Sequence, residues 1–322
     1  MKRLKDISTI ATVMLASVMA ASCADDHSPD MQPCQLAVSA GMELSVSGEA
    51  ETRSTLAQDE TFDGSQSIAV YAVATGTGSS STAKPKSVTA SSSATPTGLF
   101  WPEGKNIDVF GWYPVNGTGG VTTATALNGT ATFTIQSDQS SVANYRKSDL
   151  MFAKLTDQAH TAGETSKTLA LKFSHLLSRI QVKLTAGAGM TAADLSGATI
   201  TIGTSGAYIT GSVPISSIYG GTVGTASGSL NALLTLCTSY DSSNNNNAFA
   251  IIPPQNLNGK RLTVKLSSGA EMYVTLPSLN MTGGNAYTYT ATIAAAAVTV
   301  TATISDWGTK TGTITTGGDQ NL

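Results

Sequence analysis

The feature that most constrains the fold of this chain is a repeated alternation of apolar and polar residues over short stretches. Residues 180–184 alternate in this way, and the same two-residue period returns at 262–266 and 298–304. Successive side chains of an extended chain point to opposite faces, so this period is typical of half-buried β-strands. No stretch has the sustained period of a long amphipathic helix. The chain is therefore predicted to be all-β.

Other strands are expected between segments that are rich in Gly, Ser and Thr. All the expected strands together lie at 42–46, 67–75, 107–113, 132–136, 169–173, 180–184, 200–202, 233–236, 262–266, 272–276, 287–293 and 298–304. Residues 76–98 contain few apolar side chains and are predicted to form one long loop. The four alanines at 294–297 are expected to stay extended between two strands.

The length of the chain sets its domain organisation. At roughly 100–200 residues per domain, 322 residues correspond to about two domains. We predict two tandem β-sandwiches, residues 54–187 and 188–322, because many short strands with turns between them are typical of that architecture. The boundary falls in a Gly-containing linker where Thr191 and Asp194 have the spacing of a capping box.

The chain is unusually poor in charge. Charged residues make up 12% of it, against about 25% in an ordinary globular protein, and the net charge is −3. Scattered basic residues argue against a nucleic-acid-binding protein. A hydrophobic fraction of 41% is too high for a wholly disordered chain. A charge-poor β-protein rich in Ser, Thr and Gly is usually exported from the cytoplasm.

The N-terminus has the features of an export signal. Three basic residues lie among the first five, and the apolar stretch 7–21 follows and ends at Ser22 and Cys23. The stretch is too short to span a bilayer and has the length of a signal-peptide core. We predict that residues 1–22 are a signal peptide and that Cys23 carries lipid. The alternative is ordinary signal cleavage nearby, with Cys23 incidental. Residues 23–53 then form a tether and an N-terminal strand.

The remaining cysteines are Cys34 and Cys237. They form either one disulfide or two free or buried thiols, and both alternatives stay open. No C-x-x-C motif is present, so the sequence gives no support to a zinc site or a thioredoxin-like redox site. No metal or other cofactor is expected.

The sequence offers little to an enzyme. It contains none of the common hydrolase, metalloprotease, phosphate-binding or dinucleotide-binding motifs. His175 lies inside an apolar stretch and is expected to be a hydrogen-bonded structural residue. We therefore predict that the protein is not an enzyme.

One basic residue is set apart by its position. Arg53 is the only Lys or Arg between Lys5 and Lys84, and it precedes Ser54 in a polar stretch. A trypsin-like protease acting on this part of the chain would find a single site there. The alternative is an ordinary solvated surface arginine.

Several segments together carry a resemblance to a known family. They are the lipobox-like Cys23, Arg53 after an N-terminal strand, and the segments 99–114, 149–154, 171–184 and 283–308. In this order and spacing they resemble the fimbrillin or Mfa-like proteins of Bacteroidales, which are subunits of type V pili.

The resemblance implies a fold and an assembly mechanism. Two tandem transthyretin-like β-sandwiches would form the subunit, and the precursor would be lipidated and moved to the outer surface. Cleavage after Arg53 by a trypsin-like, Arg-specific protease would remove the N-terminal strand and leave a groove. A C-terminal strand of another subunit would then fill this groove and pair its backbone groups. The contact is heterologous, so repeated contacts build an open filament.

The family's elements correspond to particular residues here. The removed pro-strand would contain Met42, Leu44 and Val46. The donor strand would be supplied by residues at or near the C-terminal end, namely Val298, Val300, Ile304 and Ile314. Which of these strands moves is left open. The partners implied are other pilin subunits, the protease, and the outer membrane through the lipid, with the protein at the cell surface.

A second interpretation is a tip or adhesive subunit, or a non-polymerising surface lipoprotein that binds glycans or host protein. The aromatic residues that would form a sugar platform are Trp101, Trp112, Tyr113 and Trp307. Packing of these side chains in the core is the competing explanation. The sequence leaves stalk, tip and anchor positions open.

Overall fold

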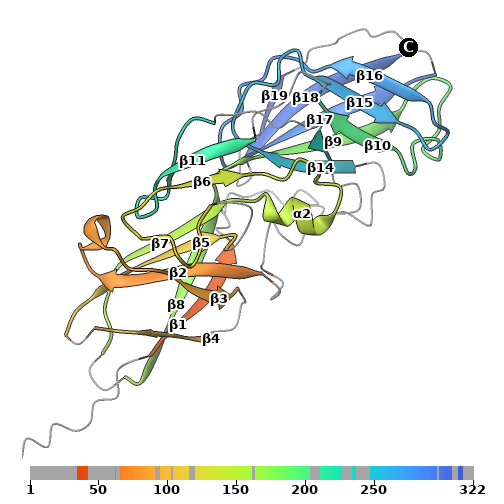
Figure 1. Ribbon diagram of the computed structural model, residues 1–322. Coiled ribbons are helices and arrows are strands. Elements are labelled where there is room, and N and C mark those ends of the chain that lie inside the picture. The colour runs from red at the N-terminus through yellow and green to blue at the C-terminus, as the bar shows by residue number, and fades with distance from the viewer. Residues whose placement is uncertain are drawn as a thin grey trace, which may run out of the picture. The chain divides into compact units, whose positions relative to one another are not determined.

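The structure is a computed structural model, and it describes residues 35–42, 62, 66–90, 95–102, 104–115, 120–161, 164–203, 211–226, 234–236, 247–295, 297–306 and 311–314. Nearly all the regular structure in this part of the chain is β, as predicted (Figure 1). The strands are β1 (Gln35–Met42), β2 (Ser67–Ala74), β3 (Lys86–Thr89), β4 (Thr95–Phe100), β5 (Ile107–Tyr113), β6 (Ala131–Thr134), β7 (Met151–Gln158), β8 (Ser166–His175), β9 (Ser178–Ala186), β10 (Thr199–Ile202), β11 (Ser212–Ser217), β12 (Thr222–Val223), β13 (Leu234–Thr235), β14 (Asn247–Ile252), β15 (Arg261–Lys265), β16 (Glu271–Thr275), β17 (Asn285–Ile293), β18 (Val298–Asp306) and β19 (Thr311–Ile314). A 3-10 turn (Gly78–Ser80) and the short helix α2 (Val142–Lys147) complete the described elements.

The first sheet has the strand order β3-β2-β5-β7-β8-β1-β4. Its two halves meet at a short junction, where β7 pairs with the end of β8 through Met151–His175 and Phe152–Ser174. An apolar core containing residues of β1, β2, β5, β7 and β8 fills the space between these halves. The halves therefore pack as two layers, β3-β2-β5-β7 and β8-β1-β4.

The later strands build three further sheets around a larger core. Their orders are β14-β9-β17-β18-β19, β13-β10-β15-β16 and β12-β11-β6. Burial alternates along β16, where Met272 and Val274 are buried and their neighbours are exposed. The two-residue period therefore places one face of this strand in the core, as the sequence predicts.

Membership of the sheets does not follow the chain order strictly. Strand β9 lies before the boundary expected at residue 188, yet it pairs with β14 and with β17. Strand β6 likewise pairs with β11 from the second half of the chain. The division into sandwiches at 54–187 and 188–322 stays a prediction.

Three local expectations are wrong. Residues 76–98 do not form one loop, because they contain β3 and most of β4. The alanine stretch does not continue the strands, because β17 ends at Ile293, the antiparallel β18 begins at Val298, and the amide of Ala294 donates to the carbonyl of Ala297 at 2.9 Å. Helix α2 has no counterpart in the prediction, and it begins where Ser141 Oγ accepts a hydrogen bond from the amide of Asn144.

The turn at Thr191 is confirmed, since its amide donates to an Asp194 carboxylate oxygen at 2.7 Å.

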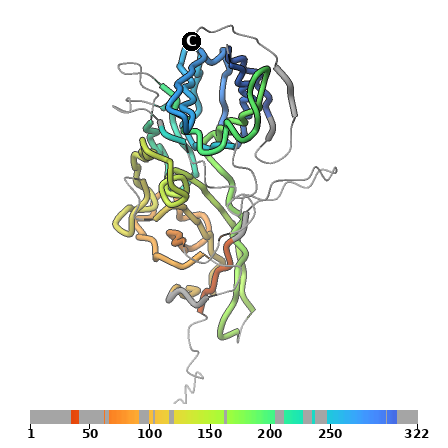
Figure 2. The backbone as a smooth tube through the Cα atoms, turned by 90° about the vertical axis from the view of Figure 1, so that its right-hand side faces the viewer, coloured from red at the N-terminus to blue at the C-terminus, as the bar shows by residue number. Residues whose placement is uncertain are grey.

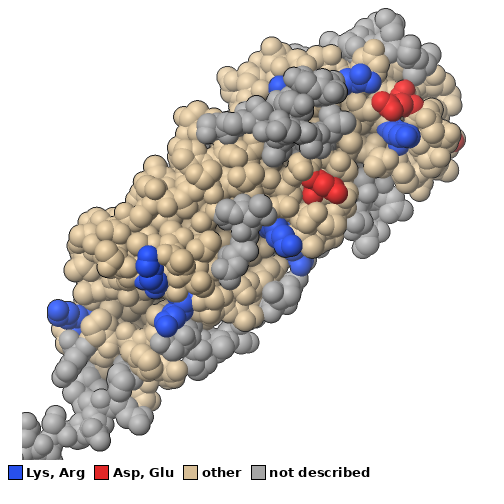
Figure 3. All heavy atoms as spheres, in the orientation of Figure 1, with Lys and Arg blue, Asp and Glu red and all other residues tan. Residues whose placement is uncertain are grey.

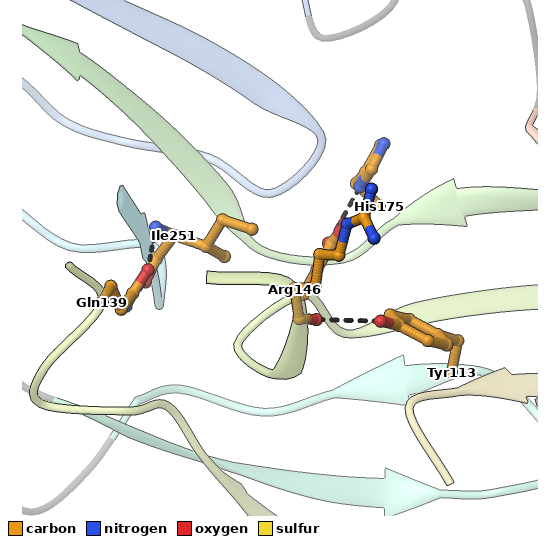
Figure 4. Close-up of polar contacts among 6 residues, drawn as sticks. Tyr113, Gln139, Arg146, His175 and Ile251 are labelled. Carbon is orange, nitrogen blue, oxygen red and sulfur yellow. Dashed lines mark hydrogen bonds and ion pairs between the residues drawn. The ribbon is translucent and has the colours of Figure 1, made fainter. Parts of the chain in front are cut away.

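A buried glutamine ties the segment before α2 to the larger core. Gln139 is fully buried, and its Oε1 accepts from the amide of Ile251 at 2.8 Å while its Nε2 donates to the Ile251 carbonyl at 2.7 Å (Figure 4). Strand β14 lies at the edge of its sheet. The Gln139 side chain therefore gives the amide and carbonyl of Ile251 the hydrogen-bond partners that a neighbouring strand would supply. No helix in the described part of the chain is both long enough and apolar enough to cross a membrane.

Candidate functional site

The N-terminal strand β1 lies in the middle of its layer. It pairs in parallel with β8 and antiparallel with β4, so it separates these two strands (Figures 1 and 2). An isolated N-terminal strand most simply adds to the edge of a sheet. Here the chain places its first described strand inside a layer, with backbone hydrogen bonding on both sides.

Alternate side chains of β1 enter the core. Leu36 is 0% exposed, Val38 is 2% exposed and Ala40 is 6% exposed. They share the core with Leu171 of β8 and with Phe62, which lies after Arg53 in the chain. The aromatic ring of Phe62 packs edge-on against Phe173 at 5.3 Å between ring centroids. Removal of β1 would therefore expose apolar residues that remain in the rest of the chain.

Both sides of β1 are paired in the described ladders. Register with β8 runs along the whole strand, from Gln35 opposite Ser166 to Met42 opposite Phe173. Register with β4 runs from Gln35 to Val38 and ends at Thr95, where the described residues of β4 begin, with an irregularity after Leu36. The first half of β1 thus lies between two strands, and the second half is paired with β8 in the described ladders.

The predicted pro-strand meets β1 at one of its three residues. Met42 is the last residue of β1, whereas Leu44 and Val46 lie outside the described residues. The inward residues Leu36, Val38 and Ala40 alternate before Met42, and the small residue Ala37 between them is itself buried, at 5% exposed.

The predicted processing and lipidation residues cannot be placed. Arg53, Ser54, Cys23, Cys34 and Cys237 all lie outside the described residues. The structure therefore leaves cleavage, lipidation and the disulfide as predictions.

Most predicted donor residues lie in β18, between β17 and β19. Val298 and Val300 are each 2% exposed within the larger core, and Ile304 packs against that core while partly exposed. Ile314 is the last residue of β19, an edge strand that pairs with β18. The donor candidates therefore form two different strands, one built into a core and one at an edge.

A cluster of three side chains lies where β4 ends and β8 begins. Trp101 follows β4 directly, is 3% exposed, and stacks on the His160 ring with 5.3 Å between centroids and an interplanar angle of 14°. Lys167 Nζ lies 5.7 Å from the centroid of the Trp101 ring, and this ammonium also donates to the carbonyl of Ala159. A cation above an indole face is attracted by the ring quadrupole. Trp101, His160 and Lys167 thus form one stacked group next to the Gln35 end of β1.

The aromatic residues considered for a sugar platform are mostly core residues. Trp101, Trp112 and Tyr113 are 3%, 0% and 4% exposed. The Trp112 indole donates to the carbonyl of Ile218 at 3.0 Å, and the Tyr113 hydroxyl donates to the carbonyl of Arg146 at 3.1 Å (Figure 4). Trp307 lies outside the described residues. Core packing is therefore the better explanation for the three aromatics that the structure describes.

His175 has an acidic partner that the sequence did not indicate. Its Nδ1 lies 2.9 Å from a carboxylate oxygen of Asp149, and the two side chains are 8% and 0% exposed (Figure 4). A substrate could not reach a pair buried to this degree, so it serves to hold the start of β7 against the end of β8. No group of three potential metal ligands occurs within the described residues.

The surface is as sparsely charged as the composition suggests. On the face drawn in Figure 3, most of the described surface is uncharged, and Lys and Arg side chains are scattered over it with a few Asp and Glu side chains. Among the described large apolar side chains, Phe100 and Tyr273 are exposed, at 51% and 37%. Arg261 covers the Tyr273 ring at 3.7 Å, so this aromatic face is already occupied.

The fold and the site define a class: a multi-sheet β-protein in which the first described strand is enclosed within a layer. The chain belongs to the fimbrillin-like family, whose model matches residues 52–307. No curated protein matches it.

Solved structures agree at the level of the fold. A candidate cell adhesion protein from Bacteroides uniformis ATCC 8492 is 20% identical, with a TM-score of 0.60 over 86% of this chain and 99% of that chain. Another from Bacteroides ovatus ATCC 8483 is 18% identical, with a TM-score of 0.63 over 86% of this chain and 99% of that chain.

Proposed function

We propose that this protein is a structural subunit of a cell-surface fimbrium that assembles by donor-strand exchange and so supports adhesion. Its precursor is exported as a lipoprotein through Cys23 and held at the outer membrane. Cleavage after Arg53 leaves 322 − 53 = 269 residues for the mature subunit. Membership of the fimbrillin-like family supports the fimbrial role.

The observation that carries the proposal is the position of β1. The strand precedes Arg53 in the chain and lies inside the β8-β1-β4 layer. A cut after Arg53 separates this strand covalently from the sheet that encloses it. The vacated place presents unpaired backbone groups and apolar side chains, which a strand from another subunit can satisfy.

The other arginines of the mature chain are poor protease sites. Arg146 lies in α2, Arg179 in β9 and Arg261 in β15, so each is within a hydrogen-bonded element. A protease binds an extended segment that is free of its neighbours, so α2 would have to unwind and β9 and β15 would have to separate from their sheets. An Arg-specific enzyme that cuts after Arg53 would therefore leave the mature fold intact.

The inward residues of β18 resemble those of β1. The inward side chains described in β1 are Leu36, Val38 and Ala40, and the series in β18 is Val298, Val300 and Ala302. The second and third positions are identical, and the first is smaller in β18 by one methylene group. A β18 strand inserted in the direction of β1 would therefore fill the vacated positions except for a gap of that size at the place of Leu36. We therefore assign the groove-filling role to β18.

Donation of β18 has a cost in its own sheet. Val298 and Val300 leave one apolar core and enter another, so their transfer free energies largely cancel. The remaining cost is the loss of the backbone pairing between β18 and β17 in the donor subunit. Donation of β19 would spare the larger core, but β19 offers Ile314 as its single large apolar residue.

Cleavage and assembly can be tested on purified precursor that begins after the signal peptide. Incubation with a trypsin-like, Arg-specific protease is expected to give a new N-terminus at Ser54, followed by ladders of heat-resistant oligomers. The Arg53→Ala variant should stay intact and monomeric. A cleanly cut protein that stays monomeric would contradict polymerisation and favour a non-polymerising surface lipoprotein or a tip subunit.

Two further variants separate the remaining steps. A chain that ends at Asp306 keeps β18 and lacks β19, and we expect it to polymerise. Failure to do so would assign the donor role to β19. Metabolic labelling with palmitate should mark the wild-type precursor and leave the Cys23→Ser variant unlabelled, whereas equal labelling would exclude Cys23 as the lipidated residue.

A further inference from the structure

We infer that the subunit carries filament tension through one nearly continuous segment of chain, β8 and β9, and that the ladder on each of these strands is loaded in shear. One ladder joins β8 to the strand in the place of β1, and the other joins β9 to β17. The inference rests on the proposed function, with β18 as the donated strand, and concerns how a fimbrium resists being pulled apart.

Strands β8 and β9 follow each other closely in the chain. β8 ends at His175 and β9 begins at Ser178, so Leu176 and Leu177 form the whole link between them. β8 is a wall of the site that β1 occupies, and β9 lies beside β17 in the sheet that contains β18. The site that receives a strand and the sheet that donates one are therefore joined by this short link.

Hydrogen bonds hold the link on both sides. The amide of Leu176 donates to the carbonyl of Leu150 at 2.9 Å, and the carbonyl of Leu177 accepts from the amide of Gly284 at 2.8 Å. Leu177 is fully buried in the larger core. Gly283 packs so closely on the carbonyl oxygen of Leu176 that a Cβ has no room there. Tension on β8 therefore reaches β9 without slack.

The direction of pairing sets how the first ladder is loaded. β1 is parallel to β8, with Gln35 opposite Ser166 and Met42 opposite Phe173. A donated strand in the place and direction of β1 is connected to its own subunit through its N-terminal end, which lies beside Ser166. β8 passes tension on through its C-terminal end, at His175. The two strands are pulled from opposite ends, so the evenly spaced hydrogen bonds of the ladder share the load.

The second ladder has the same geometry. β9 is parallel to β17, with Arg179 opposite Ala286 and Ala186 opposite Ile293. Tension enters β9 at its N-terminal end and leaves β17 at its C-terminal end, after which the chain continues into β18. These strands are again pulled from opposite ends. A pull on neighbouring ends would instead peel the strands apart and break their hydrogen bonds one after another.

The second ladder is also well supported by its surroundings. β9 is paired on its other side with β14, and β17 is paired on its other side with β18. Tyr287 and Tyr289 of β17 are 2% and 0% exposed, so sliding of β17 would move two large aromatic side chains out of their places in the core. We therefore expect this ladder to hold at least as long as the first one.

The experiment pulls single molecules of the uncut precursor with optical tweezers, so it requires neither cleavage nor strand exchange. One DNA handle is attached at the N-terminus, which precedes β1. The other is attached at an azide-bearing residue that replaces Ser166 at the start of β8, Ala188 after β9 or Ala295 after β17, all of which are exposed. The amide of Ala295 donates to the carbonyl of Ala188 at 3.1 Å, so these two positions lie side by side.

The handles at Ser166 and Ala188 load the same ladder in two ways. A pull through Ser166 acts on neighbouring ends of β1 and β8 and peels them apart, whereas a pull through Ala188 shears them. At one pulling speed, we expect the force at which β1 leaves β8 to be at least about twofold higher through Ala188. Equal forces, or a higher force through Ser166, would overturn the inference.

The handle at Ala295 adds the β9–β17 ladder to the path while leaving the direction of pull nearly unchanged. We expect the first rupture to occur at the same force as through Ala188 and to release the same length of chain, because β1 leaves β8 first in both cases. A first rupture at a lower force that frees β17 would overturn the load path.

Failure of this inference is distinguishable from failure of the proposed function. A precursor that resists shear in all these pulls but stays monomeric after cleavage would contradict assembly alone and would still support the load path as a property of the fold. A precursor that polymerises after cleavage but yields as easily through Ala188 as through Ser166 would contradict the load path alone.

Discussion

Strand β1 is expected to stabilise the uncut protein strongly and to contribute nothing to the assembled fimbrium, and Leu36→Ala tests both statements. Leu36 is 0% exposed and lies in the half of β1 that is enclosed by β8 and β4. A Leu→Ala change in a core costs about 2–5 kcal/mol, depending on how well the site collapses. Because neighbours flank this site on both sides, we expect a loss of roughly 3–4 kcal/mol in the free energy of unfolding.

Urea unfolding followed by circular dichroism measures this loss in the precursor. At about 2–4 °C per kcal/mol, the Tm should fall by roughly 6–16 °C. The matched control is Ser39→Ala, at a half-buried position of the same strand on the opposite phase, which should change stability by less than about 0.5 kcal/mol.

The second measurement is made after cleavage and assembly. Oligomers prepared from the Leu36→Ala precursor should melt at the wild-type temperature, because the substituted strand has left. A precursor as stable as the control would show that β1 does not hold its layer together. Oligomers that inherit the defect would show that β1 remains in the mature subunit.

Three further predictions concern the scaffold. Gln139→Ala should cost about 2–4 kcal/mol, measured by urea unfolding, because it leaves the backbone amide and carbonyl of Ile251 unpaired in the core. Gly221→Ala should cost about 2–4 kcal/mol in the same assay, since φ is +63° and the new Cβ would lie 2.1 Å from the Phe152 ring. Burial raises the pKa of Tyr289, so the unfolded chain ionises near pH 10 while the folded chain keeps its proton. The contribution of Tyr289 to stability should therefore be present in full below about pH 10 and be lost as the pH rises above it, and Tyr289→Phe should reduce that fall.

Each of these changes has a matched control. Gln158→Ala removes an exposed side-chain hydrogen bond that water can replace, so it should cost little. Gly259→Ala shares a positive φ of +75° but meets nothing within 4 Å, which isolates the conformational cost of about 1 kcal/mol. Tyr273→Phe removes the hydroxyl of an exposed ring and is the control for Tyr289→Phe in the same measurement. Equal effects in a variant and its control would contradict the corresponding explanation.

The strand pattern was readable where a strand has one buried face. Strand β16 alternates between buried and exposed residues, and its period in the sequence predicts it. Strand β5 is buried along its whole length and includes Asp108, whose carboxylate accepts hydrogen bonds from the amides of Gly76 and Asp157. The sequence cannot show that such a carboxylate is satisfied, because its partners lie far from it along the chain.

Strand β4, which has a weak apolar pattern, was also predicted wrongly because the strand that pairs with it lies far away along the chain. Strand β4 was predicted as loop because it contains Pro96 and few apolar residues. It becomes a strand by pairing with β1, a partner that precedes it by about sixty residues. In β1, a strand enclosed on both sides, the small residue Ala37 is buried between the inward positions, so the two-residue period is less distinct there.

The sequence by itself determined the all-β class, the sparse charge and the isolation of Arg53 in the N-terminal part of the chain. These are properties of composition and of short periods, which depend on neighbouring residues alone. The tertiary structure decided which strand is enclosed between β8 and β4, and that His175 meets Asp149. Such facts depend on pairings between distant segments, and the local pattern of one strand does not specify its partner.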